Sequence, residues 1–459
     1  MSTQQQPKSN TLAFAILTGL FFMWGFMTVL NDILIPYLKG VFDLNHTEAM
    51  LIQFAFFGAY FIGSLIYFII SVNYGDPISM IGYKNGIILG LLISATGSAL
   101  FYPAANFLMY GFFLSALFVM GLGFTLLQIA ANPYVAILGS EKSASSRLNL
   151  SQGFNSLGTT IGPLIGGYLI FKYFVGPDIS GADAVKIPYL FFTGIFLLLA
   201  VLIKMANLPR FTKDETLEKG LGVLKHKHLV YGILAIFMYV GGEVSIGSIL
   251  ISYLGLENIA GLNESDASKY VAFYWGGLMI GRFMGAVSLS KMKDLRLKYL
   301  TMLSIPIAAF LVIFYFNGMQ TASIYAIFLV LNFLGFLIGK SLPNRTLFVF
   351  AFISVLLLII TLLSHGLVAM WAVIGIGLFN SIMWSNIFTL AISGLGKHTS
   401  QGSSLLVMAI LGGALVPVVQ GMMADAYGVH LSFIVPIFCY LYIAFYGLKG
   451  YIRKSEKII

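Results

Sequence analysis

The sequence contains almost no cysteine and very little charge. Its single cysteine, Cys439, lies inside an apolar run, so a disulfide framework cannot form and a cysteine-based metal site is not expected. Asp, Glu, Lys and Arg make up only 9% of the 459 residues, whereas a soluble globular chain carries about a quarter charged residues. This composition excludes a water-soluble fold.

The sequence also lacks the common motifs of pumps and hydrolases. No GxxxxGK[ST], HExxH, CxxC or GxSxG pattern occurs, so ATP-driven pumping and the usual membrane-hydrolase chemistry find no support. We expect no cofactor, no catalytic residue and no certain metal site, and therefore not an enzyme. A membrane-embedded enzyme acting on a lipid-linked sugar is the weaker alternative, since it needs a catalytic pair facing a lipid-open groove.

What the sequence does contain is long apolar stretches. Apolar residues make up 59% of the chain and the mean hydropathy is +0.92. A membrane-spanning helix needs about 20 such residues, and on that criterion the sequence predicts about fourteen spans. The spans are residues 11–37, 48–72, 85–104, 107–138, 147–174, 188–207, 228–256, 268–290, 297–316, 322–339, 346–363, 367–395, 402–424 and 430–449.

The basic residues fix an orientation for these spans. With the N-terminus inside, all of the 26 Lys and Arg except Lys39, Lys172, Lys186 and Lys269 fall on the inner side. This bias is the one that the positive-inside rule describes. It accounts for the net charge of +9 without nucleic-acid binding. We expect a multi-pass protein of the cell inner membrane, in contact with the lipid bilayer, with both termini in the cytoplasm.

The spans divide into two halves. A charged stretch predicts a cytoplasmic linker at 208–227, between an N-terminal six-helix bundle (1–207) and a C-terminal bundle (228–459). The triplets Ser151-Gln152-Gly153 and Ser400-Gln401-Gly402 open corresponding helices of a repeat. Carriers built from such repeats bind substrate near the membrane midplane, where the repeats meet. The halves match if residues 297–340 are an inserted hairpin, which we expect to face lipid and to have no direct role.

Two carboxylates fall within the predicted spans. Asp32 lies in the first helix and Glu243 in the first helix of the second half. An ionised carboxylate at bilayer depth is costly, so such residues usually line a cavity or mark an ion path. Each is interpreted as an ion-coupling residue that binds H⁺ or Na⁺, with Na⁺ considered at Asp32. The alternative is a structural carboxyl that is hydrogen-bonded internally.

Amides and indoles form the second group of candidates. A sugar presents hydroxyl groups, which amides can hold, and an apolar ring face, which aromatic side chains can cover. Single polar residues of this kind are also common as contacts between helices, and that alternative stays open for each. The predicted sugar-binding residues are Asn31, Gln128, Asn132, Gln152, Asn155, Trp275, Asn380 and Trp384.

Several segments resemble the fucose permease and glucose/galactose transporter branch of the major facilitator superfamily. In fucose permeases, acidic residues of the first and fourth helices serve sugar recognition and proton coupling. The first corresponds to Asp32, but the fourth-helix position is Gln128, as in the glucose/galactose branch, which includes sodium-coupled carriers. The segments that carry the resemblance are Phe21–Asp32, Leu127–Gly139, Leu148–Gly158, Gly377–Gly396 and Gly402–Gly413.

The resemblance and the residue patterns lead to one prediction of fold and function. The fold is an all-α integral membrane protein of the major facilitator type, with two six-helix bundles plus the inserted hairpin. The function is symport of a hexose such as glucose, galactose or fucose with H⁺ or Na⁺ by alternating access, by a monomer. A non-transporting sugar sensor or receptor with a carrier fold is the alternative, although neither linker nor tail is long enough for an output domain.

Overall fold

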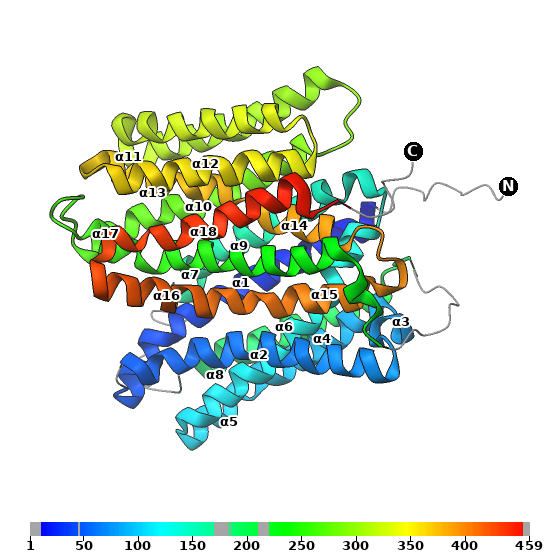
Figure 1. Cartoon of the computed structure of the whole chain (residues 1–459). Coiled ribbons are helices and arrows are strands. Elements are labelled where there is room, and N and C mark those ends of the chain that lie inside the picture. Colours follow the sequence, from blue (N-terminus) through cyan, green and yellow to red (C-terminus); the bar gives the residue numbers. More distant parts are fainter. Residues whose placement is uncertain (1–10, 45, 169–182, 184, 210–219, 453–459) are drawn as a thin grey trace. The chain divides into compact units, whose positions relative to one another are not determined.

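The computed structural model describes residues 11–44, 46–168, 183, 185–209 and 220–452, with the backbone alone at 30–37 and a few other positions. Every regular element within these residues is a helix (Figure 1). The chain forms two compact units. The first comprises Met1–Ala144, Phe154–Val223 and Leu395–Met408, and the second comprises Ser145–Gly153, Leu224–Gly394 and Ala409–Ile459. The predicted halves remain a prediction, and the predicted linker lies partly outside the described residues.

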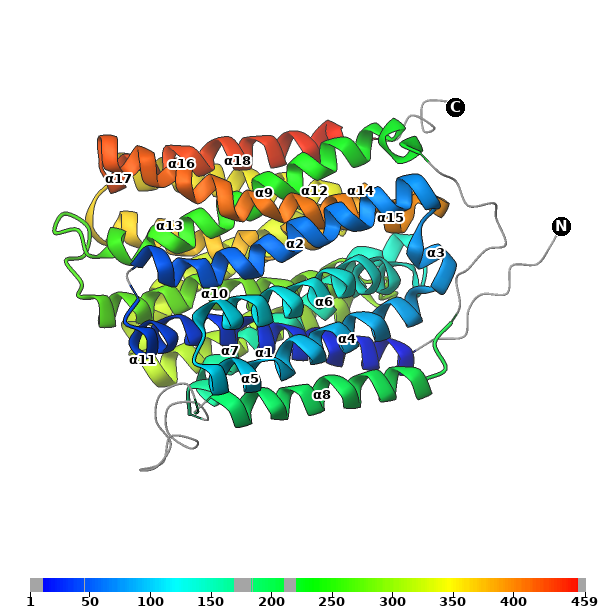
Figure 2. The same ribbon diagram turned by 90° about the horizontal axis from the view of Figure 1, so that it is seen from below.

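The first unit is an all-helical bundle in which α4 packs against both α6 and α8 (Figure 2). Glycines allow this contact: a Cβ on Gly97 would lie 2.3 Å from the Met120 nitrogen. A Cβ on Gly123 would lie 2.2 Å from the Ser94 Oγ. The helices of the first unit are α1 (Thr11–Phe42), α2 (His46–Tyr74), α3 (Pro77–Ile81), α4 (Tyr83–Ala99), α5 (Phe101–Phe107), α6 (Tyr110–Ile137), most of α7 (Ala144–Tyr168), α8 (Lys186–Met205) and α15 (Thr399–Met408).

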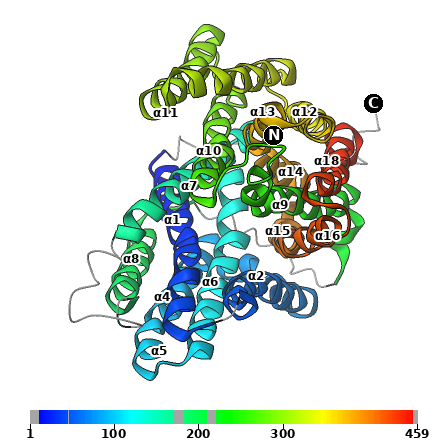
Figure 3. The same cartoon turned by 90° about the vertical axis from the view of Figure 1, so that its left-hand side faces the viewer.

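In the second unit, α12 packs against α13 and α18 (Figure 3). Helix α9 lies beside both α16 and α18. Short turns at Ala409–Leu411 and Tyr446–Gly450 extend α16 and α18. The helices are α9 (Lys227–Leu254), α10 (Glu264–Ser288), α11 (Leu295–Gly339), α12 (Pro343–Leu363), α13 (Gly366–Asn380), α14 (Met383–Ile392), α16 (Gly412–Tyr427), α17 (Val429–Ser432) and α18 (Ile434–Phe445).

Corresponding glycines make equivalent contacts in the two units. In the first unit, a Cβ on Gly158 of α7 would lie 2.2 Å from the Phe22 oxygen of α1. In the second, a Cβ on Gly412 of α16 would lie 2.0 Å from the Phe237 oxygen of α9. Small residues at helix contacts let backbones approach closely in membrane proteins. The two helix backbones are therefore in close contact at both positions.

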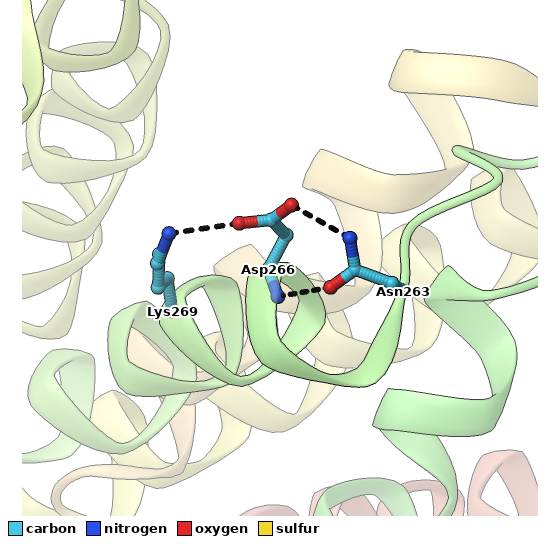
Figure 4. A network of polar contacts seen from close by, with 3 residues as sticks. All are labelled: Asn263, Asp266 and Lys269. Carbon is cyan, nitrogen blue, oxygen red and sulfur yellow. Dashed lines mark hydrogen bonds and ion pairs between the residues drawn. The ribbon is translucent and has the colours of Figure 1, made fainter.

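Helix α10 begins with a small polar network (Figure 4). Asn263 caps the helix, accepting a hydrogen bond from the Asp266 nitrogen at 3.0 Å. Lys269 Nζ and Asn263 Nδ2 donate to the two Asp266 carboxylate oxygens, at 2.8 and 2.9 Å. These hydrogen bonds, that of Lys269 first, lower the pKa of Asp266 below its ordinary value. The network fixes where α10 starts.

Helix α11 doubles back on itself. Its 45 residues are two helical arms joined at Gly318, whose φ of 79° is outside the helical range. Lys298, near the start of the first arm, donates from Nζ to Ser341 Oγ just after the second arm, at 2.8 Å. The same Nζ donates to the Ser290 oxygen at 3.1 Å. We call residues 295–317 the first arm and 319–339 the second arm.

The length and composition of the helices fit a membrane protein. Among the described residues, 10 helices are long and apolar enough to cross a membrane, with α11 counted once despite its break. The structure therefore supports an all-helical, multi-pass membrane protein. It does not confirm the count of about fourteen spans.

Candidate functional site

A cluster of buried polar side chains lies within the second unit. Glu243 and Tyr239 come from α9, Tyr274 from α10, Asn380 from the end of α13, and Tyr440 from α18. The Tyr274 hydroxyl donates to the main-chain oxygen of Glu243 at 2.9 Å, and Asn380 Nδ2 donates to the Tyr274 hydroxyl at 2.8 Å. All five side chains are at most 9% exposed. We call these five residues the tyrosine cluster.

The tyrosine cluster leaves several polar atoms unmatched. Among the described residues, the Tyr239 hydroxyl, the Tyr440 hydroxyl and Asn380 Oδ1 are buried and have no hydrogen-bond partner. Tyr239 interacts electrostatically with the Glu243 carboxyl but lacks the geometry of a hydrogen bond. A buried polar group without a partner costs about 1–3 kcal/mol. Three unmatched atoms in one cluster make it a candidate binding site, although unmatched atoms also occur elsewhere in the described residues, for example at Tyr189 and Gln420.

A charged neighbour acts on the Glu243 carboxyl. Arg282 of α10 interacts with it electrostatically. Arg282 also donates from Nε to the Ser381 oxygen at 3.2 Å. The guanidinium therefore joins the carboxylate region to the residue that follows α13. A buried charge without a compensating partner is strongly unfavourable, and Arg282 provides part of that compensation.

The candidate site coincides with a break in a helix. Helix α13 ends at Asn380 and α14 starts at Met383, although residues 366–392 form one apolar segment long enough to span a membrane. Ser381 Oγ donates to the Leu378 oxygen at 2.6 Å, which satisfies a carbonyl in the last turn of α13. Discontinuous helices are frequent at the substrate and ion sites of transporters, because their ends leave main-chain groups free to bind.

The two tryptophans predicted for this half have different environments. Trp384 is buried in α14, its ring stacked on Phe388 with centroids 6.0 Å apart, and its Nε1 is another buried atom without a partner. The break separates it from Asn380, so the two residues do not lie on one continuous helix. Trp275 is 43% exposed and contacts the Tyr274 ring edge-on. It lies at the margin of the tyrosine cluster.

The start of α7 belongs to the second unit, and it carries Gln152. Gln152 is buried. Neighbouring residues form a separate set of hydrogen bonds. Asn149 Nδ2 donates to Asn386 Oδ1 at 3.2 Å, and the Ser145 and Thr389 hydroxyls lie 2.6 Å apart. These contacts join segment 145–153 to α14.

The amides of the first unit are buried on α6. Gln128 and Asn132 lie one turn apart, and Asn132 Nδ2 donates to the Gln128 main-chain oxygen at 3.1 Å. The Gln128 side chain interacts with the Tyr60 hydroxyl of α2, which also contacts the Trp24 side chain of α1. Three helices therefore meet at Gln128. Asn155 is only half-buried.

Asn155, Asn31 and Asp32 complete the predicted set. Asn155 Nδ2 donates to the Phe21 oxygen at 2.9 Å, and thus joins α7 to α1 as a helix contact would. The backbones of Asn31 and Asp32 lie in α1, but their side chains lie outside the described residues. The prediction that Asp32 couples the ion therefore stays a prediction, as does the shared midplane chamber.

Sequence reasoning missed two members of the tyrosine cluster. Tyr239 lies one helical turn before Glu243, so the spacing offered a signal. Tyr440 lies in an apolar segment with no polar neighbour, and nothing in its local sequence separates it from a packing tyrosine. Tyr274 is the residue that joins Glu243 to Asn380, and its role depends on contacts between helices.

Comparison with known proteins gives a consistent result. The sequence pattern described as Major Facilitator Superfamily matches residues 14–345. The chain is 45% identical over 447 residues to the glucose/galactose transporter of Brucella abortus biovar 1 (strain 9-941), covering 96% of this chain and 95% of the relative. It is 31% identical to the L-fucose-proton symporter of Escherichia coli (strain K12), covering 95% and 92%.

The three-dimensional fold has the same relatives. The structure of the transporter FucP in the outward conformation is similar with a TM-score of 0.75 and 31% identity, covering 96% of this chain and 99% of that one. In sequence, the chain is also 42% identical to a putative glucose/galactose transporter of Helicobacter pylori (strain ATCC 700392 / 26695), covering 98% of this chain and 100% of the relative.

Proposed function

We propose that this chain, which belongs to the Major Facilitator Superfamily and within it to the fucose permease and glucose/galactose transporter family, is a secondary active hexose transporter. It carries the sugar together with a cation by alternating access. The names of its relatives support this function, since they include glucose/galactose transporters and L-fucose-proton symporters. Membership of this family also distinguishes the chain from enzymes.

The tyrosine cluster is the observation on which the proposal depends. It contains a buried carboxylate, two tyrosine hydroxyls and an amide oxygen without hydrogen-bond partners, beside a break in a membrane helix. Sugar hydroxyls both donate and accept hydrogen bonds, so they can satisfy hydroxyl and amide groups alike. A carboxylate that gains and loses a cation can link occupancy of the site to an ion gradient.

The proposed roles follow the chemistry of each side chain. Glu243 and Asp32 couple the cation, which is H⁺ or Na⁺, and the proton-symporting relative supports H⁺. Asn380, Trp384, Gln128 and Asn132 are the proposed contacts to the hexose. Residues Asn31, Gln152, Asn155 and Trp275 complete the proposed sugar-binding set, of which Asn155 and Trp275 have the weaker support.

We also propose fourteen helices, with α11 as an insertion in a twelve-helix arrangement. Without α11, the packing partners of α12, which are α13 and α18, correspond to those of α4, which are α6 and α8. The distribution of basic residues supports cytoplasmic termini and an inner-membrane location. A monomer is also proposed.

Uptake by liposomes that contain the purified protein tests the proposal. Radiolabelled glucose, galactose and fucose are offered separately, with an inward Na⁺ gradient, an inward proton gradient or no gradient. We expect glucose or galactose to enter faster than into protein-free liposomes, and one of the gradients to accelerate entry. Entry of every sugar at the protein-free rate would refute the proposal.

A further inference from the structure

The second arm of α11 is packed into the second unit along one complete face. Its buried residues recur every three or four positions, which is the helical period of a single stripe. By contrast, the first arm ends in exposed residues, among them Tyr315, which is 81% exposed. The buried stripe comprises Ala322, Tyr325, Phe328, Leu329, Asn332, Gly335, Phe336 and Gly339. This arm therefore packs one face on the second unit while its other face is exposed, and the expectation that the hairpin has no direct role stays a prediction.

Glycines on two neighbouring helices receive this stripe. A Cβ on Gly277 of α10 would lie 2.8 Å from the Tyr325 hydroxyl, and a Cβ on Gly375 of α13 would lie 2.3 Å from the Phe328 ring. Both distances are shorter than a side chain permits, so α10 and α13 have space for the second arm only because these positions are glycine.

Two hydrogen bonds join the stripe to the same pair of helices. The Tyr325 hydroxyl donates to the Phe273 oxygen of α10 at 2.9 Å. Asn332 Nδ2 donates to the Leu378 oxygen of α13, also at 2.9 Å. Tyr325 and Asn332 are seven residues apart, which places them two turns apart on one face. Asn332 is fully buried in a stretch, residues 326–339, that is otherwise apolar, where an amide is unfavourable unless it is hydrogen-bonded.

Both acceptors lie next to the tyrosine cluster. Phe273 immediately precedes Tyr274, and Leu378 lies two residues before Asn380, in the last turn of α13. Tyr274 and Asn380 are joined by their own hydrogen bond. The backbones touch here, since a Cβ on Gly377 would lie 2.0 Å from the Tyr274 oxygen. The second arm therefore holds α10 and α13 at the point where their side chains form the candidate site.

We infer that the second arm of α11 is part of the hexose site, with Tyr325 and Asn332 as positioning residues that set the placement of Tyr274 and Asn380. The inference rests on the proposed function, since it assumes that these two side chains serve hexose transport. Neither Tyr325 nor Asn332 touches the sugar. Their hydrogen bonds fix the separation of α10 and α13. They thereby set the distance between the Tyr274 and Asn380 side chains, which bind the sugar.

Substitutions on the two arms test this inference. Tyr325→Phe removes one hydroxyl without changing ring size, and Asn332→Leu removes the amide. The hairpin offers matched controls at exposed positions, Tyr315→Phe and Asn317→Leu. Each purified protein is assayed for equilibrium binding of the hexose that the wild type transports best, for counterflow in liposomes, for glucose-to-galactose selectivity, and for thermal melting.

We expect the Kd for hexose to change while the melting temperature stays close to that of the wild type. Tyr325→Phe and Asn332→Leu raise the Kd and the KM about fivefold, as loss of a positioning hydrogen bond predicts, and they alter the selectivity. The maximal counterflow rate stays close to that of the wild type. Both controls match the wild type. Asn332→Leu removes a buried amide and can reduce the yield of folded protein. If it does, the comparison of Tyr325→Phe with Tyr315→Phe decides the outcome.

Other outcomes overturn the inference in distinguishable ways. A lower melting temperature with an unchanged Kd shows that the second arm supports the fold and not the site. Equal binding by Tyr325→Phe and Tyr315→Phe, in a wild type that transports hexose, refutes the inference alone. If the wild type neither binds nor exchanges any hexose, the proposed function fails and the inference fails with it.

Discussion

Asn380, the last residue of α13, donates from Nδ2 to the hydroxyl of Tyr274 on α10 at 2.8 Å. This hydrogen bond joins the end of α13 to Tyr274. The Tyr274 hydroxyl in turn donates to the main-chain oxygen of Glu243 in α9. The contact unites three helices of the second unit around the Glu243 position.

Removal of the central hydroxyl is expected to weaken hexose binding. Tyr274→Phe leaves Asn380 Nδ2 without its Tyr274 partner and removes the hydrogen bond to the Glu243 main-chain oxygen, at a cost of about 1–3 kcal/mol. We expect the KM for hexose counterflow to rise at least fivefold. Tyr299→Phe, at an exposed position of α11, is the control. An unchanged KM in Tyr274→Phe would place the sugar elsewhere.

Neutralisation of the buried carboxylate is expected to separate accumulation from exchange. In Glu243→Gln the side chain keeps its size but no longer binds a cation. The ion gradient therefore no longer drives hexose transport. We expect gradient-driven accumulation to disappear while counterflow of labelled hexose continues. Glu257→Gln, an exposed carboxylate after α9, should accumulate sugar as the wild type does. Full accumulation by Glu243→Gln would remove Glu243 from the coupling mechanism.

Gln128 provides the corresponding test in the first unit. Its side chain interacts with Tyr60, and its amide is proposed to hold a sugar hydroxyl. Gln128→Ala is expected to raise the Kd for hexose about fivefold, the equivalent of one hydrogen bond. Titration calorimetry on the purified protein measures this change. Asn73→Ala, at an exposed position of α2, should leave the Kd unaltered, and equal Kd values for both variants would show that the amide site is misplaced.

The contact between α10 and α13 makes a prediction about stability. A Cβ at residue 377 would lie 2.0 Å from the Tyr274 oxygen, so Gly377→Ala must push the two backbones apart. Overpacking of this kind costs about 1–3 kcal/mol, and we expect a clear fall in the melting temperature. Gly276→Ala on α10 has open space and is the control. Equal melting temperatures would mean that the helices are not in close contact at this point.

Much of the helical arrangement could be predicted from apolar runs alone. The two arms of α11 fall at the predicted spans 297–316 and 322–339, with the reversal at Gly318 between them. The break between α13 and α14 could not be predicted, because Ser381 and Ile382 carry no turn signal and the apolar run continues through them. At this break the Ser381 oxygen accepts a hydrogen bond from Arg282 of α10, a contact between helices that the local sequence does not reveal.

Some residues of the candidate site could be predicted from the sequence and others could not. Glu243 and Asn380 could be identified because ionisable and amide groups are rare and costly in an apolar helix. Tyr239 and Tyr440 could not, since tyrosine serves equally for packing, and only the positions of neighbouring helices show that their hydroxyls are unmatched. The buried stripe of the second arm could not be predicted, because the apolar residues of this arm lie on all of its faces and do not show which face meets protein.

The steady-state ratio of internal to external hexose tests the central claim most directly. Liposomes that contain the wild-type protein are given external labelled glucose or galactose and an inward gradient of Na⁺ or of protons. The account predicts that one of these gradients raises the internal concentration above the external one, and that an ionophore which dissipates that gradient abolishes the excess. Equal concentrations on both sides under every gradient, in protein that exchanges hexose, would contradict it.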